Sequence, residues 1–206
     1  YIDAVASLYG RNSLVELLAQ TASEIFVPIT AGGGIRSLED ARLLLRNGAD
    51  KIAINTAAVQ NPQILRHLTE EFGSSSIVLS VEAKNVSNNQ WEVYIENGRQ
   101  KTGIDVLEWV KKGESLGVGE LLITSIDYEG TERGYDFALL KVVSEIVELP
   151  IIASGGMGDI EDLNKLVALT KVSGASMASV LHYGKETVSS LRLKAIAHNL
   201  GVRKHV

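Results

Sequence analysis

The 206-residue sequence contains no cysteine and only 3 prolines, and aromatic residues make up 5% of it. Without cysteine the chain can form no disulfide, bind no metal through thiolates and use no cysteine nucleophile. No apolar run approaches the roughly 18 residues that a membrane-spanning helix needs, and no signal peptide opens the chain. We therefore predict a cytoplasmic protein that has no contact with membranes.

The chain also lacks an excess of positive charge. The formal net charge is −5, so there is no surplus of positive charge for binding nucleic acid or an anionic membrane. The four histidines are scattered without the spacing of metal ligands: His67, His182, His198 and His205. We predict no metal and no cofactor. With 45% hydrophobic and 22% charged residues, the composition is that of a globular domain with one sizeable core.

Short apolar runs alternate with amphipathic helical patterns along the whole chain. The predicted strands are Tyr1–Asp3, Val27–Ala31, Lys51–Asn55, Ile77–Ala83, Leu121–Ser125, Ile151–Ser154 and Ser176–Val180. The predicted helices are Leu14–Ala22, Ser37–Asn47, Pro62–Phe72, Gly103–Leu116, Phe137–Val147, Ile160–Leu169 and Thr187–Asn199. A strand followed by a helix in every repeat predicts βα units around a buried parallel sheet.

Seven βα units exceed the five or six strands of an ordinary doubly wound sheet, and a TIM barrel has eight. The chain opens with YIDAVAS, already inside a predicted strand. We therefore predict one (βα)8 TIM-barrel domain over residues 1–206, with the first βα unit absent from the chain. The segment from Asn85 to Gly103 breaks the alternation of strands and helices. It contains the run WEVYI, in which apolar and polar residues alternate, and the turn dipeptide Asn97-Gly98. It predicts a β-hairpin inserted after the fifth strand, over the catalytic face of the barrel.

Two segments of the chain repeat one another. VPITAGGGIRSLEDARLLLRNGADKIAIN (Val27–Asn55) aligns with LPIIASGGMGDIEDLNKLVALTKVSGASMASV (Leu149–Val180), with a small insertion before Gly174. The repeat lies four strands apart and predicts a barrel of two similar halves.

The repeat carries a glycine pair directly after a strand, Gly33-Gly34 in one copy and Gly155-Gly156 in the other. Such glycines let backbone N–H groups approach a phosphate at the start of the next helix. A tight turn with positive φ explains a single pair equally well, but the recurrence at equivalent places favours phosphate. Two sites half a barrel apart suggest a long substrate with a phosphate at each end.

Several motifs together resemble the cyclase subunit of imidazole glycerol phosphate synthase. They are VPITAGGGIRSLEDARLLLRNGADKIAINTAAVQNP, IVLSVEAK, GELLITSIDYEGTERGYD, and LPIIASGGMGD with MASVLHYG, in register over nearly the whole chain. The resemblance implies a lyase-type barrel of histidine biosynthesis, paired as a heterodimer with a glutaminase subunit that supplies ammonia. The barrel would convert a bis-phosphorylated ribulosyl imidazole intermediate to imidazole glycerol phosphate and an aminoimidazole carboxamide ribotide.

The resemblance also implies roles for individual residues. One phosphate would meet Gly34, Asn55 and Thr56. The other would meet Glu129, Gly130, Gly155, Gly156, Ala178 and Ser179, and the pocket between them would be lined by Asp3, Thr124 and Ser154.

The catalytic candidates are Glu82 and Asp127. The family uses two aspartates as general acid and base. One of them lies on the first strand, and the other lies in a motif that normally reads Ile-Asp-Ala-Lys. In this chain the same motif reads Val-Glu-Ala-Lys, with Glu82 in place of the aspartate. The longer side chain keeps the carboxylate but moves it by about one ångström, and a misplacement on that scale can cost on the order of a hundredfold in rate. Glu129 likewise stands where the family has aspartate. Asp127 ends a strand, where barrel chemistry occurs, although a loop-capping role explains it as well.

At the opposite end of the barrel the resemblance places Asp50, Lys51 and Glu120 at the entrance for ammonia and on the partner face. An ordinary salt bridge between strand starts is the simpler alternative for Lys51 and Glu120.

Two alternatives to the synthase remain. YIDAVASLYGRNSL and SVEAK also resemble a paralogue from surface-polysaccharide gene clusters that takes part in installing an acetamidino group on a sugar. The chain could instead be a non-catalytic barrel that docks and activates a glutaminase. A glutaminase partner is expected in every case, because the chain has no cysteine with which to hydrolyse glutamine itself.

Overall fold

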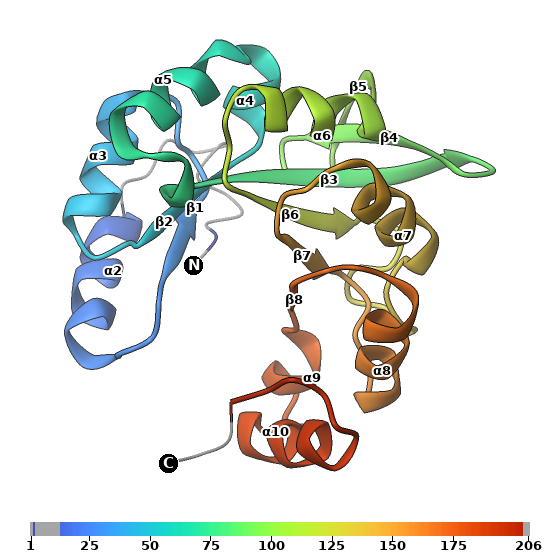
Figure 1. Ribbon diagram of the computed structural model, residues 1–206. Coiled ribbons are helices and arrows are strands. Elements are labelled where there is room, and N and C mark those ends of the chain that lie inside the picture. Colours follow the sequence, from blue (N-terminus) through green and yellow to red (C-terminus); the bar gives the residue numbers. More distant parts are fainter. Residues whose placement is uncertain (1, 3–12, 204–206) are drawn as a thin grey trace.

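The computed structural model describes Ile2 and residues 13–203, which form an α/β fold around a curled, mainly parallel sheet (Figure 1). Neighbouring strands of the sheet follow the order of the sequence: β1 (Thr30–Gly32), β2 (Lys51–Ile54), β3 (Ile77–Ser87), β6 (Glu120–Ser125), β7 (Ile151–Ser154) and β8 (Gly174–Ala175). Ile2 forms a parallel bridge to Gly32, on the outer side of β1. Consecutive parallel neighbours joined by helices are consistent with a TIM barrel, as the alternating pattern predicted.

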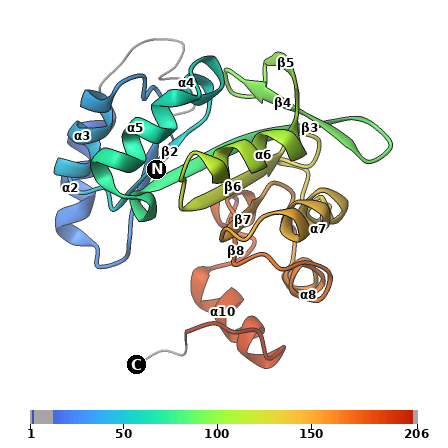
Figure 2. The same ribbon diagram turned by 45° about the horizontal axis from the view of Figure 1, so that its top comes forward.

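The helices lie around the outer side of the curled sheet (Figure 2). They are α2 (Ser13–Glu24), α3 (Leu38–Arg46), α4 (Thr56–Gln60), α5 (Gln63–Phe72), the 3-10 turn η1 (Ser74–Ser76), α6 (Val106–Ser115), α7 (Phe137–Ile146), α8 (Ile160–Leu169), α9 (Ser179–His182) and α10 (Val188–Ala197). Over these described ranges, no helix is both long enough and apolar enough to cross a membrane. The short helices α4 and α9 were not predicted from the sequence.

Local sequence signals explain where the repeat helices begin. Ser37 caps α3 by accepting from the backbone N–H of Asp40, whose carboxylate accepts in return from the N–H of Ser37. Asp159 and Asp162 form the same reciprocal box at the start of α8. Each box satisfies backbone donors that a helix leaves free in its first turn.

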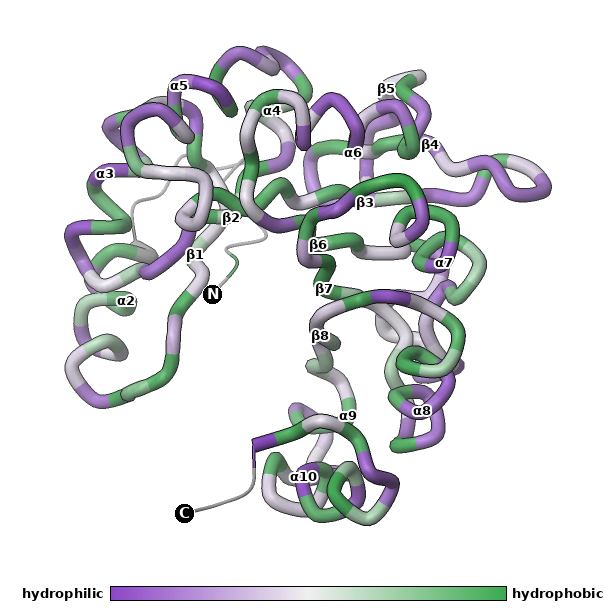
Figure 3. The backbone as a smooth tube through the Cα atoms, viewed as in Figure 1, coloured by the Kyte–Doolittle hydropathy of each residue, from purple (hydrophilic) through white to green (hydrophobic). Residues whose placement is uncertain are grey.

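The core lies between the sheet and the helices, and β3 shows how the sequence creates it. Ile77, Leu79 and Val81 are fully buried, and Ser80 and Glu82 alternate with them on the other face of the strand. Burying side chains of this size stabilises a fold by roughly 1.5–3 kcal/mol each. Figure 3 shows the resulting pattern, with hydrophobic segments along β6 and β7 and hydrophilic segments on the outer helices.

The predicted hairpin is present, but it begins earlier than expected. β3 itself continues past the other parallel strands and pairs antiparallel with β4 (Gln90–Ile95), which pairs antiparallel with β5 (Gln100–Asp105). Asn97 and Gly98 lie in the turn with φ of 58° and 72°, the left-handed conformation that this dipeptide favours. The prediction of a helix from Gly103 is wrong in its first turn, because β5 runs to Asp105 and the Asp105 carboxylate then caps α6.

The last strand is also displaced from its predicted position. The prediction of Ser176–Val180 is wrong, because β8 comprises only Gly174–Ala175, opposite Ile152 and Ala153 of β7. β7 ends at Ser154, so pairing cannot continue far; the Ser176 N–H makes one more bond to the Ala153 carbonyl, and α9 then begins at Ser179. Similarly, β1 begins at Thr30 instead of Val27.

Candidate active site

Three of the predicted site residues lie in one row across the sheet. Glu82 on β3 is in register with Thr124 on β6, and Thr124 is in register with Ser154 on β7. Register partners on parallel strands present their side chains to the same face. The row lies near the carboxyl ends of the strands, where α/β proteins place their binding sites.

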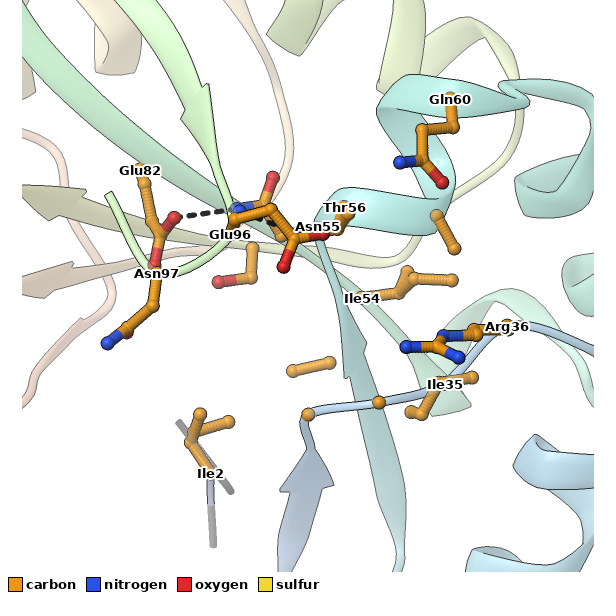
Figure 4. A pocket seen from close by; sticks show the side chains of 15 residues that line it. Ile2, Ile35, Arg36, Ile54, Asn55, Thr56, Gln60, Glu82, Glu96 and Asn97 are labelled. Carbon is orange, nitrogen blue, oxygen red and sulfur yellow. Dashed lines mark hydrogen bonds between the residues drawn. The ribbon is translucent and has the colours of Figure 1, made fainter. Parts of the chain in front are cut away.

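A pocket of about 390 Å³ adjoins this row at the carboxyl ends of β1, β2 and β3 (Figure 4). Its volume is within the range of small-molecule sites. Four predicted site residues line it: Gly34, Asn55, Thr56 and Glu82. Gly33 of the predicted glycine pair also lines it, and the remaining residues that line it are Ile2, Ile35, Arg36, Ala53, Ile54, Ala57, Gln60, Ser80, Glu96 and Asn97.

Glu82 is one of the titratable residues that line the pocket. Its Oε2 accepts a hydrogen bond from Asn55 Nδ2 at 3.0 Å and another from the Gly98 backbone N–H at 2.8 Å. Burial raises the pKa of the Glu82 carboxyl above its usual range, and the negative charges of Glu129 and Glu96 add to the rise, whereas the two hydrogen bonds oppose it. A carboxyl with a raised pKa keeps its proton to a higher pH than an ordinary glutamate does, which suits it to act as a general acid.

The glycine loop after β1 forms another wall of the pocket. Gly33 and Gly34 have φ of 98° and 71°, a conformation that other residues rarely adopt. Arg36 follows them and contributes a cationic side chain to the same pocket. The sequence prediction missed Arg36, although its place directly after the glycines was a signal, and it missed Ser80, which precedes Glu82 by one strand period.

The second predicted phosphate set lies apart from this pocket. A Cβ on Gly156 would stand 1.9 Å from the Gly134 carbonyl oxygen, and one on Gly155 would stand 2.8 Å from the Ser125 oxygen. The Gly134 N–H also donates to the Gly156 carbonyl at 2.8 Å. These glycines therefore let the loop after β7 pack against the loop after β6, and their φ values of 94° and 104° agree with the simpler interpretation of a tight turn.

The remaining members of that set take different positions. Glu129 and Gly130 are exposed in the loop after β6, and Ala178 precedes α9, which Ser179 begins. Their role in binding phosphate stays a prediction.

Asp127 has a partner in the structure and does not line the pocket. Its Oδ2 accepts from the Asn85 backbone N–H at 2.7 Å and so joins the loop after β6 to the outer part of β3. This contact agrees with the capping alternative, and a catalytic role for Asp127 stays a prediction. Asp3 lies outside the described residues.

The predicted entrance residues meet at the opposite, amino-terminal end of the sheet. Lys51 Nζ and Glu120 Oε2 form an ion pair of 2.6 Å between the first residues of β2 and β6. Asp50 Oδ2 accepts from the Ile29 N–H at 2.7 Å. Phe26, in the loop before β1, is 100% exposed. Within the part of the chain that the structure describes, no group of three His, Cys, Asp or Glu residues is arranged to hold a metal ion.

A curled parallel α/β sheet with a pocket at the carboxyl ends of its strands is consistent with the βα-barrel class of proteins. The chain belongs to the histidine biosynthesis protein family, which matches residues 1–187. It is 56% identical over 164 residues to the imidazole glycerol phosphate synthase subunit HisF of Legionella pneumophila, covering 80% of this chain and 77% of that protein. It is 44% identical over 204 residues to the subunit of the same name from Lactococcus lactis subsp. cremoris (strain SK11), covering 98% and 79%.

Proposed function

We propose that this chain is the cyclase subunit of an imidazole glycerol phosphate synthase. It uses ammonia to convert a bis-phosphorylated ribulosyl imidazole intermediate to imidazole glycerol phosphate and an aminoimidazole carboxamide ribotide. The observation that carries the proposal is the 44% identity to a synthase subunit over 98% of the chain. The relatives do not favour the polysaccharide paralogue or the non-catalytic barrel, because they carry the synthase name.

In this reaction Glu82 is the general acid and base. A new carbon–nitrogen bond from ammonia requires a proton to leave the nitrogen, and the later elimination requires a proton to reach the departing group. A half-buried carboxyl whose pKa is raised can do both in turn. Thr124 and Ser154, in the same row, orient the substrate by hydrogen bonds from their hydroxyl groups.

The pocket beside Glu82 holds one end of the substrate. We assign one phosphate to Gly34 and Thr56, with Asn55 between them and Glu82, and Arg36 supplies a positive charge at the same place. The other phosphate goes to Glu129, Gly130, Gly155, Gly156, Ala178 and Ser179. Asp127 is the candidate for a second acid or base.

The opposite end of the sheet receives a glutaminase partner in a heterodimer. The named relatives are subunits of a synthase, and this chain has no cysteine with which to release ammonia from glutamine. Lys51, Glu120 and Asp50 would line the entrance for ammonia, and the fully exposed Phe26 in the loop before β1 offers an apolar side chain for docking. The arrangement in two half-barrels stays a prediction, as do the first βα unit and the cytoplasmic location.

Turnover with free ammonium ions tests the proposal. The protein is incubated with the bis-phosphorylated ribulosyl intermediate and an ammonium salt at alkaline pH, and loss of substrate is followed by its absorbance. Formation of both products is the expected result. Tight binding without turnover would favour the paralogue, and neither binding nor turnover would favour the non-catalytic barrel.

A further inference from the structure

The β4–β5 hairpin lies against the pocket and makes three hydrogen bonds there. The Gly98 N–H donates to Glu82 Oε2 at 2.8 Å, and the Glu96 N–H donates to Thr56 Oγ1 at 3.2 Å. Asn55 Nδ2 donates to the Tyr94 carbonyl at 3.1 Å, just before the turn. The hairpin is therefore attached to the residues at the end of β2 and to the candidate acid on β3.

Asn55 is the residue that joins these two elements. Its Nδ2 has two protons, and the structure uses both, one for Glu82 Oε2 at 3.0 Å and one for Tyr94. Its Oδ1 is buried and has no partner among the described residues. Flipping the amide would turn this oxygen toward two other acceptors, so the present orientation is fixed.

The two carboxylate oxygens of Glu82 differ in their hydrogen bonds. Oε2 accepts both donors, whereas Oε1 accepts no hydrogen bond from the described residues. We propose that Asn55 and the β4–β5 turn are positioning elements that hold Glu82 by Oε2 and leave Oε1 as the oxygen that exchanges protons with the substrate. The catalytic half of this statement rests on the proposed function.

The length of the Glu82 side chain is what allows the contact. Replacing it by aspartate would withdraw the carboxylate by about one ångström, somewhat less than one carbon–carbon bond. From 2.8 and 3.0 Å, such a withdrawal takes both donors out of hydrogen-bond range. The hairpin turn thus fits a glutamate at this position, and Glu82→Asp is expected to lose the contact to Gly98 even though it keeps the charge.

Asn55→Leu tests the positioning role in the enzyme. We expect kcat to fall by about ten- to a hundredfold, as a misplaced catalytic group does, with KM changed by less than about twofold. In a Glu82→Gln background the same change should lower the residual rate by less than about twofold, because the group to be positioned is gone. A raised KM with unchanged kcat would overturn the proposal and leave Asn55 only a phosphate ligand.

A second readout does not depend on activity. Carboxyl-carbon NMR of glutamate-labelled protein follows the titration of Glu82, identified by its loss in Glu82→Gln. Removing a donor to Oε2 should raise the pKa of Glu82 in Asn55→Leu, and an unmoved titration would contradict the proposal. If Asn55→Leu does not fold, Asn55→Ser gives the same test. Absence of turnover in the unaltered protein would refute the proposed function, and the titration would still decide on the positioning contacts.

The hairpin side is tested by two matched glycine changes. Gly98 and Gly103 belong to the same hairpin and have φ of 72° and 73°. A Cβ on Gly98 would meet Ile126 Cδ1 at 3.3 Å, whereas one on Gly103 would meet nothing within 4 Å. Gly98→Ala should shift the turn, raise the pKa of Glu82 and lower kcat. Gly103→Ala should have none of these three effects. Equal effects of the two changes would show that hairpin stability alone matters and would overturn the proposal.

Discussion

The two glycine loops of the repeat have the same local structure and different surroundings. Gly33-Gly34 and Gly155-Gly156 all have positive φ, and each pair precedes a helix that begins with a reciprocal capping box. The first pair lines a pocket, whereas Gly156 packs closely against the backbone of Gly134 in the loop after β6. A local sequence pattern therefore determines the backbone conformation, and residues distant in the sequence determine whether a ligand can reach it.

Of the substitutions that compare the two loops, Gly156→Ala is expected to lower the stability of the protein most. The new Cβ would stand 1.9 Å from a backbone oxygen, and φ is 104°, so the loop after β7 must move or the chain must unfold. We expect a loss of about 3 kcal/mol or more in the free energy of unfolding, measured by denaturant titration. The control is Gly73→Ala, where φ is 84° and a Cβ would meet nothing within 4 Å; it should cost only about 1 kcal/mol. Equal losses would mean that packing does not distinguish the second loop.

Gly34→Ala should affect binding more than stability. Gly34 lines the pocket with φ of 71°, and we assign its backbone to an anionic ligand. Displacing one backbone hydrogen bond to a charged group should weaken binding of the bis-phosphorylated intermediate by about tenfold or more, measured by calorimetric titration. Unchanged affinity would remove the glycine loop from the phosphate site.

These two loops also show what the sequence could and could not predict. Apolar runs and capping residues act locally, so strand β7 and helix α8 were predicted with the bounds that the structure has. The site residues Glu82, Thr124 and Ser154 were expected only because the resemblance to the synthase family implies them, and the structure places them in one row. The contact between Gly98 and Glu82 could not be predicted, because it depends on β3 continuing into the hairpin and on the turn folding back over the pocket. The shortened β8 depends in the same way on where its neighbour β7 ends.

A smaller effect, on stability, is expected from Glu82→Gln beside the first loop. The pKa of Glu82 is raised in the folded protein, so folding favours its protonated form, and the charged form destabilises the fold as pH rises through that pKa. Glu82→Gln should therefore raise the melting temperature at pH 8 and leave it nearly unchanged at about pH 3, below the pKa of an ordinary glutamate, where the carboxyl is protonated in folded and unfolded chains. The control is Glu70→Gln, which makes the same change at an exposed position on α5, outside the pocket. A Glu82→Gln protein that is less stable at pH 8 would contradict the assignment of a raised pKa.

The smallest effect on the fold is expected far from both loops. Phe26 is fully exposed, so Phe26→Ser should change the free energy of unfolding by less than about 0.5 kcal/mol. The same change should weaken association with a glutaminase by about tenfold or more if Phe26 is a docking residue, measured by calorimetry with the purified partner. Unaltered association would place the docking surface elsewhere.

The most direct test of the account compares the protein with its Glu82→Gln variant for ammonium-dependent turnover and for affinity to the bis-phosphorylated intermediate. If Glu82 is the working acid and base in the pocket at the ends of β1, β2 and β3, turnover should fall by at least about a hundredfold while affinity changes by less than about threefold. A variant that retains full turnover would remove Glu82 from the chemistry, and with it the assignment of this pocket as the catalytic site.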